Sequence, residues 1–413
     1  MTYSLPNTKK TVAVFIGGAS PEHDVSVVSG LQAYQAIDRS LYDPFIVYIT
    51  TNGRFFIGEG LDQRNFYVPS VADLAKLSEV TIDVQNTDGA GKGALIAKKS
   101  GIIGAPKRTL FDIAMPVLHG LSGENGNIQG LFEMMGIAYT GMRVMGSAIA
   151  MDKVTTKQML AALDIATLPY AVLKRPNEGY LIPRSEIEAS LKDIGFPVIV
   201  KPTHLGSSIG VAKANDLDEV AAALPVIFQY DTAAIIEPFV QNLVEYNVSV
   251  IQGEEGAVTS AIERPKGTDE LLDFKQKYCS SGGTKGGVKS GGVKSVGQIS
   301  EGMLSLTREL NPEITKAQDQ FIRDAAMSFY NAAGGAGAPR IDFIGNRETG
   351  EVWFNEVNPC PGSYGYFLWE AAPEPILFTK FITHLLCEAM HHARASILPD
   401  DPVPKDAQLF KRK

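Results

Sequence analysis

The sequence predicts an α/β protein in which an N-terminal, doubly wound-like α/β domain is followed by two smaller α+β units. Apolar strand-like runs alternate with helix-like segments over about the first 145 residues, a pattern typical of a sheet covered on both faces. Strong turn segments then divide the remainder into two further groups of strands. The chain has 413 residues, 45% of them hydrophobic, which is enough for two or three domains with buried cores.

The N-terminal domain is predicted over residues 1–145. Residues 11–16 are apolar throughout, which indicates a parallel strand buried on both faces. Ser20 suits an N-cap and Pro21 suits the first helical position, so a helix is expected to begin there. Residues 44–50 and 111–118 predict two more strands.

A central unit is predicted over residues 146–224. Residues 146–163 read as one helix, residues 168–174 as a strand and residues 185–195 as a second helix. The strand PVIVKP then meets GVAKA through the turn THLGSSI. These elements predict a small α+β unit.

A third unit is predicted over residues 225–395. It contains strands at 233–239 and 246–252, a helix near 317–333, and a final hairpin of APRIDFIG and EVWFNEVN joined by NRETG. Residues 280–297 are rich in Gly, Ser and Lys and repeat GGVKS, so residues 275–297 are expected to form a mobile loop or lid. A solvated surface insertion is the alternative, and residues 396–413 are expected to be a tail.

The charge balance and the cysteines exclude several classes of protein. Lys and Arg total 38 against 46 Asp and Glu, so a net charge of −8 gives no global attraction to nucleic acid or an anionic membrane. No stretch approaches the roughly 18 apolar residues of a membrane span. Three widely spaced cysteines predict neither a disulfide framework nor a CxxC metal site. We therefore expect a cytoplasmic protein.

The strongest chemical cluster lies on the final hairpin. Arg340 and Asp342 share one face of their strand, and Glu356 and Asn358 share one face of the next. Pairing of the two strands would bring all four together. Two carboxylates and an amide oxygen are hard ligands suited to magnesium that also binds phosphate. The alternative is an edge hairpin with solvated charges.

Two weaker signals point to anion binding. The Gly/Ser turn at 206–210 follows Lys201 and would let backbone amides and hydroxyls cover phosphates, although such turns are usually only turns. His119 ends a strand before a Gly-rich loop, where a pocket is expected, although a lone histidine is more often structural. Neither GGASPEH nor GGVKS fits a GxGxxG or Walker A pattern.

Taken in order, five segments resemble the D-alanine–D-alanine ligase family of the ATP-grasp superfamily. They are GGASPEHDVSVVSG, PVLHGLSGENGNIQG, YTGMRVMGSAIAMDKVTTKQML, VIVKPTHLGSSIGVAKA and RIDFIGNRETGEVWFNEVNPCPG. The resemblance runs from Val12 to about Ala372. It implies that two ATP-grasp subdomains clamp ATP and that the protein is an ADP-forming ligase. Such a ligase joins small amino acids through an acyl phosphate for cell-wall synthesis, and the resemblance also implies a homodimer.

The resemblance also implies roles for single residues. Lys153, Lys201, Ser207 and Ser208 would hold the phosphates of ATP, with Glu237 and Val240 at the adenine and Glu245 at the ribose. Asp342, Glu356 and Asn358 would bind Mg²⁺, or Mn²⁺ in its place. Asp24 and His119 would bind the first amino acid, and Arg340 and Gly362 would stabilise the tetrahedral intermediate. Lys277 and Tyr278 would lie in the closing loop, with Tyr278 reaching toward Ser207.

Three departures from the family leave the substrates open. Asp24 stands where the family usually has Glu. The segment PGSYGYFLWEAA, residues 361–372, is shorter than in the family and lacks a counterpart of the serine that holds the second carboxylate, for which Ser363, Tyr364 and Tyr366 are candidates. The GGVKS repeat adds Lys285, Lys289 and Lys294. A ligase of another amino-acid or amine pair is thus the main alternative, ahead of a non-catalytic nucleotide-binding protein and a kinase-like enzyme.

Overall fold

The computed structural model describes residues 3–67, 69–85, 91–98, 106–206, 210–266, 308–395 and 407. Several predictions fall outside these residues: the phosphate contacts of Ser207 and Ser208, the loop at 275–297 with Lys277, Tyr278, Lys285, Lys289 and Lys294, and the tail apart from Ala407. Within the described ranges, no helix is long and apolar enough to cross a membrane. The mixed α/β class predicted from the sequence is confirmed by three separate sheets.

The first sheet has eight strands in the order β6-β5-β4-β3-β2-β1-β7-β8. The parallel half contains β1 (Lys10–Gly17), β2 (Tyr42–Ile49), β7 (Ile113–Val117) and β8 (Ala138–Tyr139). The antiparallel half contains β3 (Phe55–Ile57), β4 (Ser78–Ile82), β5 (Gly93–Ala97) and β6 (Arg108–Phe111). The buried parallel strand predicted at 11–16 is confirmed. The strand predicted at 111–118 is instead the end of β6 and the whole of β7, because the chain turns at Asp112.

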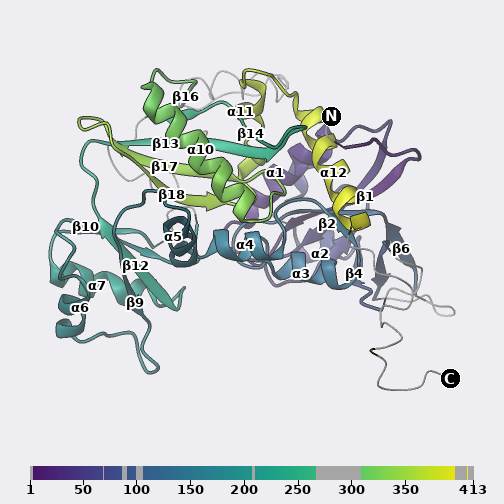
Figure 1. Ribbon diagram of the computed structural model, residues 1–413. Coiled ribbons are helices and arrows are strands. Elements are labelled where there is room, and N and C mark those ends of the chain that lie inside the picture. Colours follow the sequence, from purple (N-terminus) through teal and green to yellow (C-terminus); the bar gives the residue numbers. More distant parts are fainter. Residues whose placement is uncertain are drawn as a thin grey trace, which may run out of the picture.

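Helices cover both faces of the parallel half. On one face α1 (His23–Ala36) and α12 (Phe378–Ala395) share a core with the side chains of β1, β2 and β7. On the other, α3 (Asn127–Met134) packs with the opposite side chains of the same strands. The short η1 (Arg64–Phe66) and α2 (Val71–Leu74) lie between β3 and β4. Although α12 is the last α-helix among the described residues, it thus packs on the first sheet, where it appears in yellow beside β1 (Figure 1).

The predicted start of α1 is wrong by two residues. The helix begins at His23, its N-cap is Glu22, and that residue makes no side-chain cap. Ser20 does act locally, since its hydroxyl accepts a hydrogen bond from the backbone N–H of Glu22 at 3.1 Å. The serine therefore stabilises the turn before the helix, and Glu22 stands at the junction.

The second sheet has four antiparallel strands in the order β11-β10-β12-β9. These strands are β9 (Ala171–Lys174), β10 (Val198–Pro202), β11 (Ala212–Ala214) and β12 (Ala233–Pro238), packed against α6 (Arg184–Ser190) and α7 (Leu217–Ile227). The helix predicted at 146–163 is instead two helices, α4 (Val144–Met151) and α5 (Lys153–Ala162). Asp152 separates them with an extended backbone (φ −97°, ψ 105°), and its carboxylate accepts from the N–H groups of Val154 and Thr155. An N-cap aspartate thus overrides the helical pattern.

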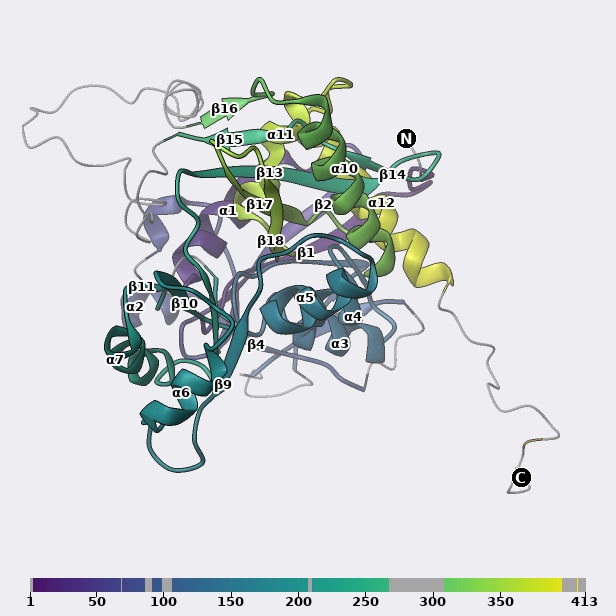
Figure 2. The same ribbon diagram turned by 60° about the vertical axis from the view of Figure 1, so that its left-hand side comes forward.

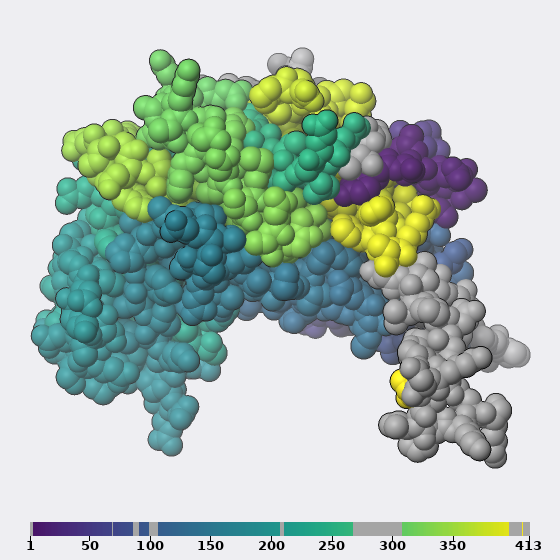
Figure 3. Space-filling view, viewed as in Figure 1, coloured from purple at the N-terminus to yellow at the C-terminus, as the bar shows by residue number. Residues whose placement is uncertain are grey.

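The third sheet has the order β16-β15-β13-β17-β18, with β14 (Ala257–Thr259) paired to β13. Its other strands are β13 (Leu243–Gln252), β15 (Glu263–Pro265), β16 (Arg308–Leu310), β17 (Arg340–Asn346) and β18 (Val352–Asn358). The predicted helix near 317–333 is α10 (Lys316–Ala332), which covers one face of this sheet together with α4 and α5. In the space-filling view the green residues of α10 rest on the blue residues of α4 and α5 (Figure 3). The turn η2 (Gly362–Gly365) and α11 (Tyr366–Glu370) lead from β18 toward α12.

The second and third sheets lie on the same side of the N-terminal sheet (Figures 1 and 2). The segment between α5 and β9 is hydrogen-bonded to the third sheet, since the N–H of Phe354 in β18 donates to Ala166 O at 3.0 Å. The first sheet meets the third through the turn after β18 and through α1. The domain boundaries predicted at residues 145, 224 and 395 stay predictions.

Candidate active site

The hairpin of β17 and β18 brings four polar side chains to one face. Asp342 stands opposite Glu356 and Arg340 stands opposite Asn358 in the strand register. The guanidinium of Arg340 binds both carboxylate oxygens of Asp342, at 2.6 and 2.7 Å, and Asn358 Nδ2 donates to Asp342 Oδ2 at 2.9 Å. The expectation that the hairpin would gather these four residues is confirmed.

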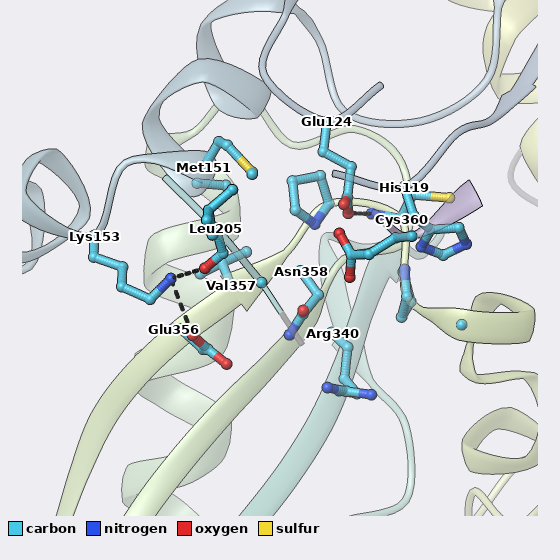
Figure 4. Close-up of a pocket in the computed structure, with 16 residues that line it drawn as sticks. His119, Glu124, Met151, Lys153, Leu205, Arg340, Glu356, Val357, Asn358 and Cys360 are labelled. Carbon is cyan, nitrogen blue, oxygen red and sulfur yellow. Dashed lines mark hydrogen bonds and ion pairs between the residues drawn. The ribbon is translucent and has the colours of Figure 1, made fainter. Parts of the chain in front are cut away.

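A cavity opens where this hairpin meets the first sheet. It contains about 520 Å³ of empty space, part of it open to solvent. Six residues singled out in the sequence line it: His119, Lys153, Arg340, Glu356, Asn358 and Gly362. The close-up shows the side chains of Lys153 and Glu356 approaching each other on one side, with Glu124 and His119 on the other (Figure 4). The cavity therefore joins residues from distant parts of the chain.

Lys153 is placed at this cavity by the break between α4 and α5. Its ammonium donates to the carbonyl oxygen of Leu205 at 2.7 Å and lies 3.4 Å from Glu356 Oε2 (Figure 4). Leu205 and Gly206 also line the cavity, directly before residues 207–209. The lysine thus connects the start of α5, the turn after β10 and the end of β18.

A buried charge cluster lies on the second sheet. The carboxylate of Glu237, which is 3% exposed, contacts Lys157 Nζ at 2.6 Å and Lys201 Nζ at 2.7 Å. Lys201 also donates to Asn355 Oδ1 at 3.3 Å. Asn355 is the extra residue of a β-bulge in β18, because Asp342 pairs with Glu356 and Phe343 with Phe354. The bulge thus links the second sheet to the third.

The pKa values of this cluster reflect burial opposed by ion pairing. Burial alone would raise the pKa of Glu237, but the two lysines outweigh it and lower the pKa to about 2. Burial lowers the pKa of Lys157, and Glu237 offsets only part of that effect. For Lys201 the attraction of Glu237, Glu356 and Glu245 outweighs burial, so its pKa is raised. Lys157 was not predicted from the sequence, since nothing in a helical TTKQ segment marks it as a site residue.

The structure places Asp24, the residue predicted to bind the first amino acid, outside the cavity. The side chain of Asp24 is fully exposed and makes a contact of 3.0 Å with His23 Nδ1. Glu22, two residues earlier, is 8% exposed and lines the cavity. The reason is the start of α1 at His23, which leaves Glu22 at the helix junction and turns Asp24 to solvent. Glu22 was not predicted, although it lies in the quoted segment GGASPEH.

His119 and Glu124 form the buried wall of the cavity. Burial, reinforced by the charge of Arg340, lowers the pKa of His119 to about 4, so its imidazole is neutral at pH 7. Within the described residues, His119 Nε2 makes no hydrogen bond.

Glu124 accepts hydrogen bonds from the backbone N–H groups of Gly120 at 2.7 Å and Cys360 at 2.9 Å. Burial and the charge of Glu22 raise the pKa of Glu124. Glu124 was not predicted, although it lies in the quoted segment GLSGENG.

The remaining predicted residues lie around the second and third sheets. Glu245 is on β13 opposite Ile344, two residues before Asn247, which pairs with Asp342. Glu245 therefore faces the same side of the sheet as Asp342. Val240 follows β12 and is partly exposed. Gly362 begins η2 at the end of the cavity.

His204 supports the turn that precedes residues 207–209. Its Nδ1 lies 2.7 Å from Asp231 and its Nε2 lies 3.6 Å from Asp152, the residue that caps α5. The nearby carboxylates of Asp152 and Asp231 raise the pKa of His204 to about 9. The protonated imidazole thus ties β10, α5 and the turn before β12 together.

This arrangement predicts a pH-dependent contribution to stability. Because the folded-state pKa of His204 is raised from 6.5 to about 9, its contribution is complete below pH 6.5 and is lost as the pH rises through about 9. The difference in melting temperature between the wild-type protein and His204→Gln is therefore expected to be largest near pH 6 and to decrease as the pH rises through about 9. His391→Gln, at an exposed position of α12, is the control. A difference that stays constant between pH 6 and 10 would contradict this account.

Comparison with known families agrees with this geometry. The model described as "D-ala D-ala ligase N-terminus" matches residues 11–142, and "D-ala D-ala ligase C-terminus" matches residues 159–294 and 304–386. A D-alanine–D-alanine ligase of Acetivibrio thermocellus is 31% identical over 394 residues, covering 91% of this chain and 95% of the relative. The corresponding enzyme of Ruminiclostridium cellulolyticum is 30% identical, covering 92% and 95%.

Solved structures show the same fold. The D-alanine–D-alanine ligase of Helicobacter pylori superposes with a TM-score of 0.66 at 25% identity, covering 92% of this chain and 99% of that one. A D-Ala:D-Ser ligase of Enterococcus faecalis superposes with a TM-score of 0.67 at 23% identity, covering 94% and 100%. The chain therefore belongs to the D-alanine–D-alanine ligase family and has its ATP-grasp fold.

Proposed function

We propose that this protein joins two molecules of D-alanine, with conversion of ATP to ADP and phosphate. The observation that carries the proposal is the cluster of Arg340, Asp342, Glu356 and Asn358 on one hairpin face, with Lys153 3.4 Å from Glu356. Carboxylates beside fixed cations suit the transfer of a phosphoryl group, because its developing charge must be neutralised.

The donor set fits a magnesium ion. Asp342 and Glu356 contribute carboxylates and Asn358 an amide oxygen from adjacent strands. Within the part of the chain that the structure describes, no three His, Cys, Asp or Glu side chains gather as a metal site. A set this small suits Mg²⁺, which completes its shell with water and substrate phosphate rather than with an all-protein cage. When bound, the ion would neutralise charge on the phosphates and hold them for transfer.

The reaction proposed has two steps. First, a carboxylate oxygen of one D-alanine attacks the γ-phosphorus of ATP, and ADP leaves. The amine of the second D-alanine then attacks the carbonyl carbon of this acyl phosphate, phosphate leaves and the amine loses a proton. Lys153 and Lys201 would hold the phosphates, and Arg340 and Gly362, which line the cavity, would stabilise the tetrahedral intermediate.

We further propose that Glu22 binds the ammonium group of the first D-alanine. It is a nearly buried carboxylate in the wall of the cavity, next to neutral His119. Glu22→Gln is expected to raise the KM for the first substrate about 10- to 100-fold, since a charge-assisted hydrogen bond is lost. Initial rates at saturating ATP would measure this change. Asp24→Asn is the matched control and should alter KM less than about twofold, because Asp24 is solvent-exposed.

Magnesium-dependent ADP release by the purified protein tests the proposed function. D-alanine, L-alanine and a panel of other amino acids would be supplied, and each product identified by mass. Formation of D-alanyl-D-alanine supports the proposal. If D-alanine is inert while another pair reacts, the ligase chemistry holds and the substrate assignment is wrong. ADP release without an acceptor amine would indicate a kinase-like enzyme, and no release with any substrate a non-catalytic protein.

Two parts of the proposal rest on the resemblance alone. They are a cytoplasmic location, where ATP and amino acids are available, and a homodimer. Light scattering during size-exclusion chromatography would measure the mass of the assembly directly.

A further inference from the structure

Two of the three candidate hydroxyls after β18 are engaged away from the cavity. Ser363 is bound to α1, because its N–H donates to Ser29 Oγ at 2.9 Å and its hydroxyl bonds Gln32 Oε1. Tyr364 is 4% exposed and lies at a second, smaller cavity beside Thr140. The ring of Tyr366 stacks on Phe378 with a centroid distance of 4.5 Å. Neither Ser363 nor Tyr364 is thus placed to bind the carboxylate of a second amino acid.

Arg308 is a cation on the same face of the third sheet as the acidic residues of the hairpin. On this sheet Leu310 pairs with Glu263, Glu263 with Asn247, and Asn247 with Asp342. Directly paired residues share a face, and so do residues two apart on a strand. Arg308, two residues before Leu310, thus faces the same side as Asp342.

The segment at residues 361–372, which follows β18, packs directly against the guanidinium of Arg308. Arg308 Cζ lies 4.1 Å from the ring centre of Phe367 in α11. Its Nη1 contacts Glu263 Oε1 at 3.1 Å, and the other oxygen of Glu263 accepts from Asn247 at 3.2 Å. Figure 2 shows α11 close to β15 and β16 at the upper edge of the sheet. Arg308 is thereby held in one orientation from two sides.

Arg308 retains capacity to bind an anion. Its Nε is buried and makes no hydrogen bond within the described residues. Burial lowers the pKa of Arg308, the charge of Glu263 opposes this effect, and the charge of Arg340 adds to it. Arg308 and Arg340 face the same side of the third sheet, where their charges favour an anion, and the unpartnered Nε–H of Arg308 supplies a directed donor for a carboxylate.

We propose that Arg308 binds the carboxylate of the second amino-acid substrate, held in position by Phe367 and Glu263. The inference rests on the proposed ligase function and identifies the acceptor as an amine that carries a carboxylate. The shortened segment then acts through packing on the arginine instead of through a serine hydroxyl of its own.

An acceptor without a carboxylate can show whether a variant of Arg308 has lost binding of the second substrate or has lost activity in general. Hydroxylamine reacts with an acyl phosphate through its nitrogen, phosphate leaves and a proton is lost, so that a hydroxamate forms. It needs no partner for a carboxylate. The ratio of dipeptide to hydroxamate therefore reports second-substrate binding, and it does not depend on the fraction of protein that is folded.

The test compares the wild-type protein, Arg308→Met, Arg308→Lys and Arg264→Met. Arg264 is the matched control, because it neighbours Glu263 on β15, faces the other side of the sheet and pairs with Glu309 at 2.6 Å. Arg308→Met is expected to lower the dipeptide-to-hydroxamate ratio, at a fixed subsaturating amino-acid concentration, by about tenfold or more. Arg308→Lys is expected to show a smaller loss, since charge remains without the planar donor pair. Arg264→Met should leave the ratio unchanged.

The outcomes distinguish the inference from the proposed function. An unchanged ratio in Arg308→Met, or an equal loss of dipeptide and hydroxamate, overturns the role of Arg308. Failure of the wild-type protein to form either product overturns the ligase function itself. If the wild-type protein uses an amino acid other than D-alanine as acceptor, the same ratio is measured with that amino acid and decides the role of Arg308 in the same way.

Discussion

Glu356→Gln is expected to reduce magnesium-dependent ADP release by about a thousandfold, equivalent to about 4 kcal/mol of transition-state stabilisation. Glu356 is opposite Asp342 in the hairpin and 3.4 Å from Lys153, so it lies at the proposed metal site and beside a lysine that is proposed to hold the phosphates. Glutamine keeps the shape of the side chain but removes its charge. A coupled assay of ADP release, repeated at increasing Mg²⁺ concentration, would measure the loss.

The same residue type on the same hairpin provides a control. Glu351 lies in the exposed turn before β18, where its carboxylate accepts from the hydroxyl of Thr349. Glu351→Gln should retain nearly full activity, because it is remote from the cavity. If Glu356→Gln kept more than about a tenth of the wild-type rate, less than about 1.4 kcal/mol would be lost and the assignment of Glu356 to the metal site would be wrong.

The second large effect concerns stability. Glu237→Gln is expected to lower the free energy of unfolding by about 3–5 kcal/mol at pH 7, because two buried lysines lose their shared counter-charge. Both carboxylate oxygens of Glu237 are engaged, at 2.6 Å by Lys157 and 2.7 Å by Lys201. Urea unfolding followed by circular dichroism would measure the change.

The pH dependence of this effect has a definite sign. The folded-state pKa of Glu237 is lowered from 4.5 to about 2, so its contribution is present above pH 4.5 and is lost as the pH falls through about 2. The difference in free energy of unfolding between the wild-type protein and Glu237→Gln should therefore become smaller as the pH falls toward 2. Lys157→Met should cost less than Glu237→Gln, since Glu237 still pairs with Lys201. An equal or larger cost for Lys157→Met would contradict the bridging role of the carboxylate.

The local sequence pattern was sufficient to predict features that depend on one strand or on two adjacent strands. The i, i+2 spacing on two adjacent strands placed Arg340 beside Asp342 and Glu356 beside Asn358, because side chains alternate strictly along a strand. The apolar run at 11–16 likewise predicted a strand buried on both faces. By contrast, Ser20 and Asp152 compete for the same backbone N–H groups that a helix would use, and this competition decided where α1 and α5 begin.

The sequence alone determined the fold class, the family and the hairpin that gathers Arg340, Asp342, Glu356 and Asn358, since these depend on short-range periodicity and on ordered motifs. Only the tertiary structure decided that α12 packs on the first sheet, that Lys157 shares Glu237 with Lys201, and that Arg308 faces the same side as Asp342. Each of these requires strand order or packing between segments far apart in the chain. Such contacts are selected by the burial of the whole core and leave no periodic signal in the residues that make them.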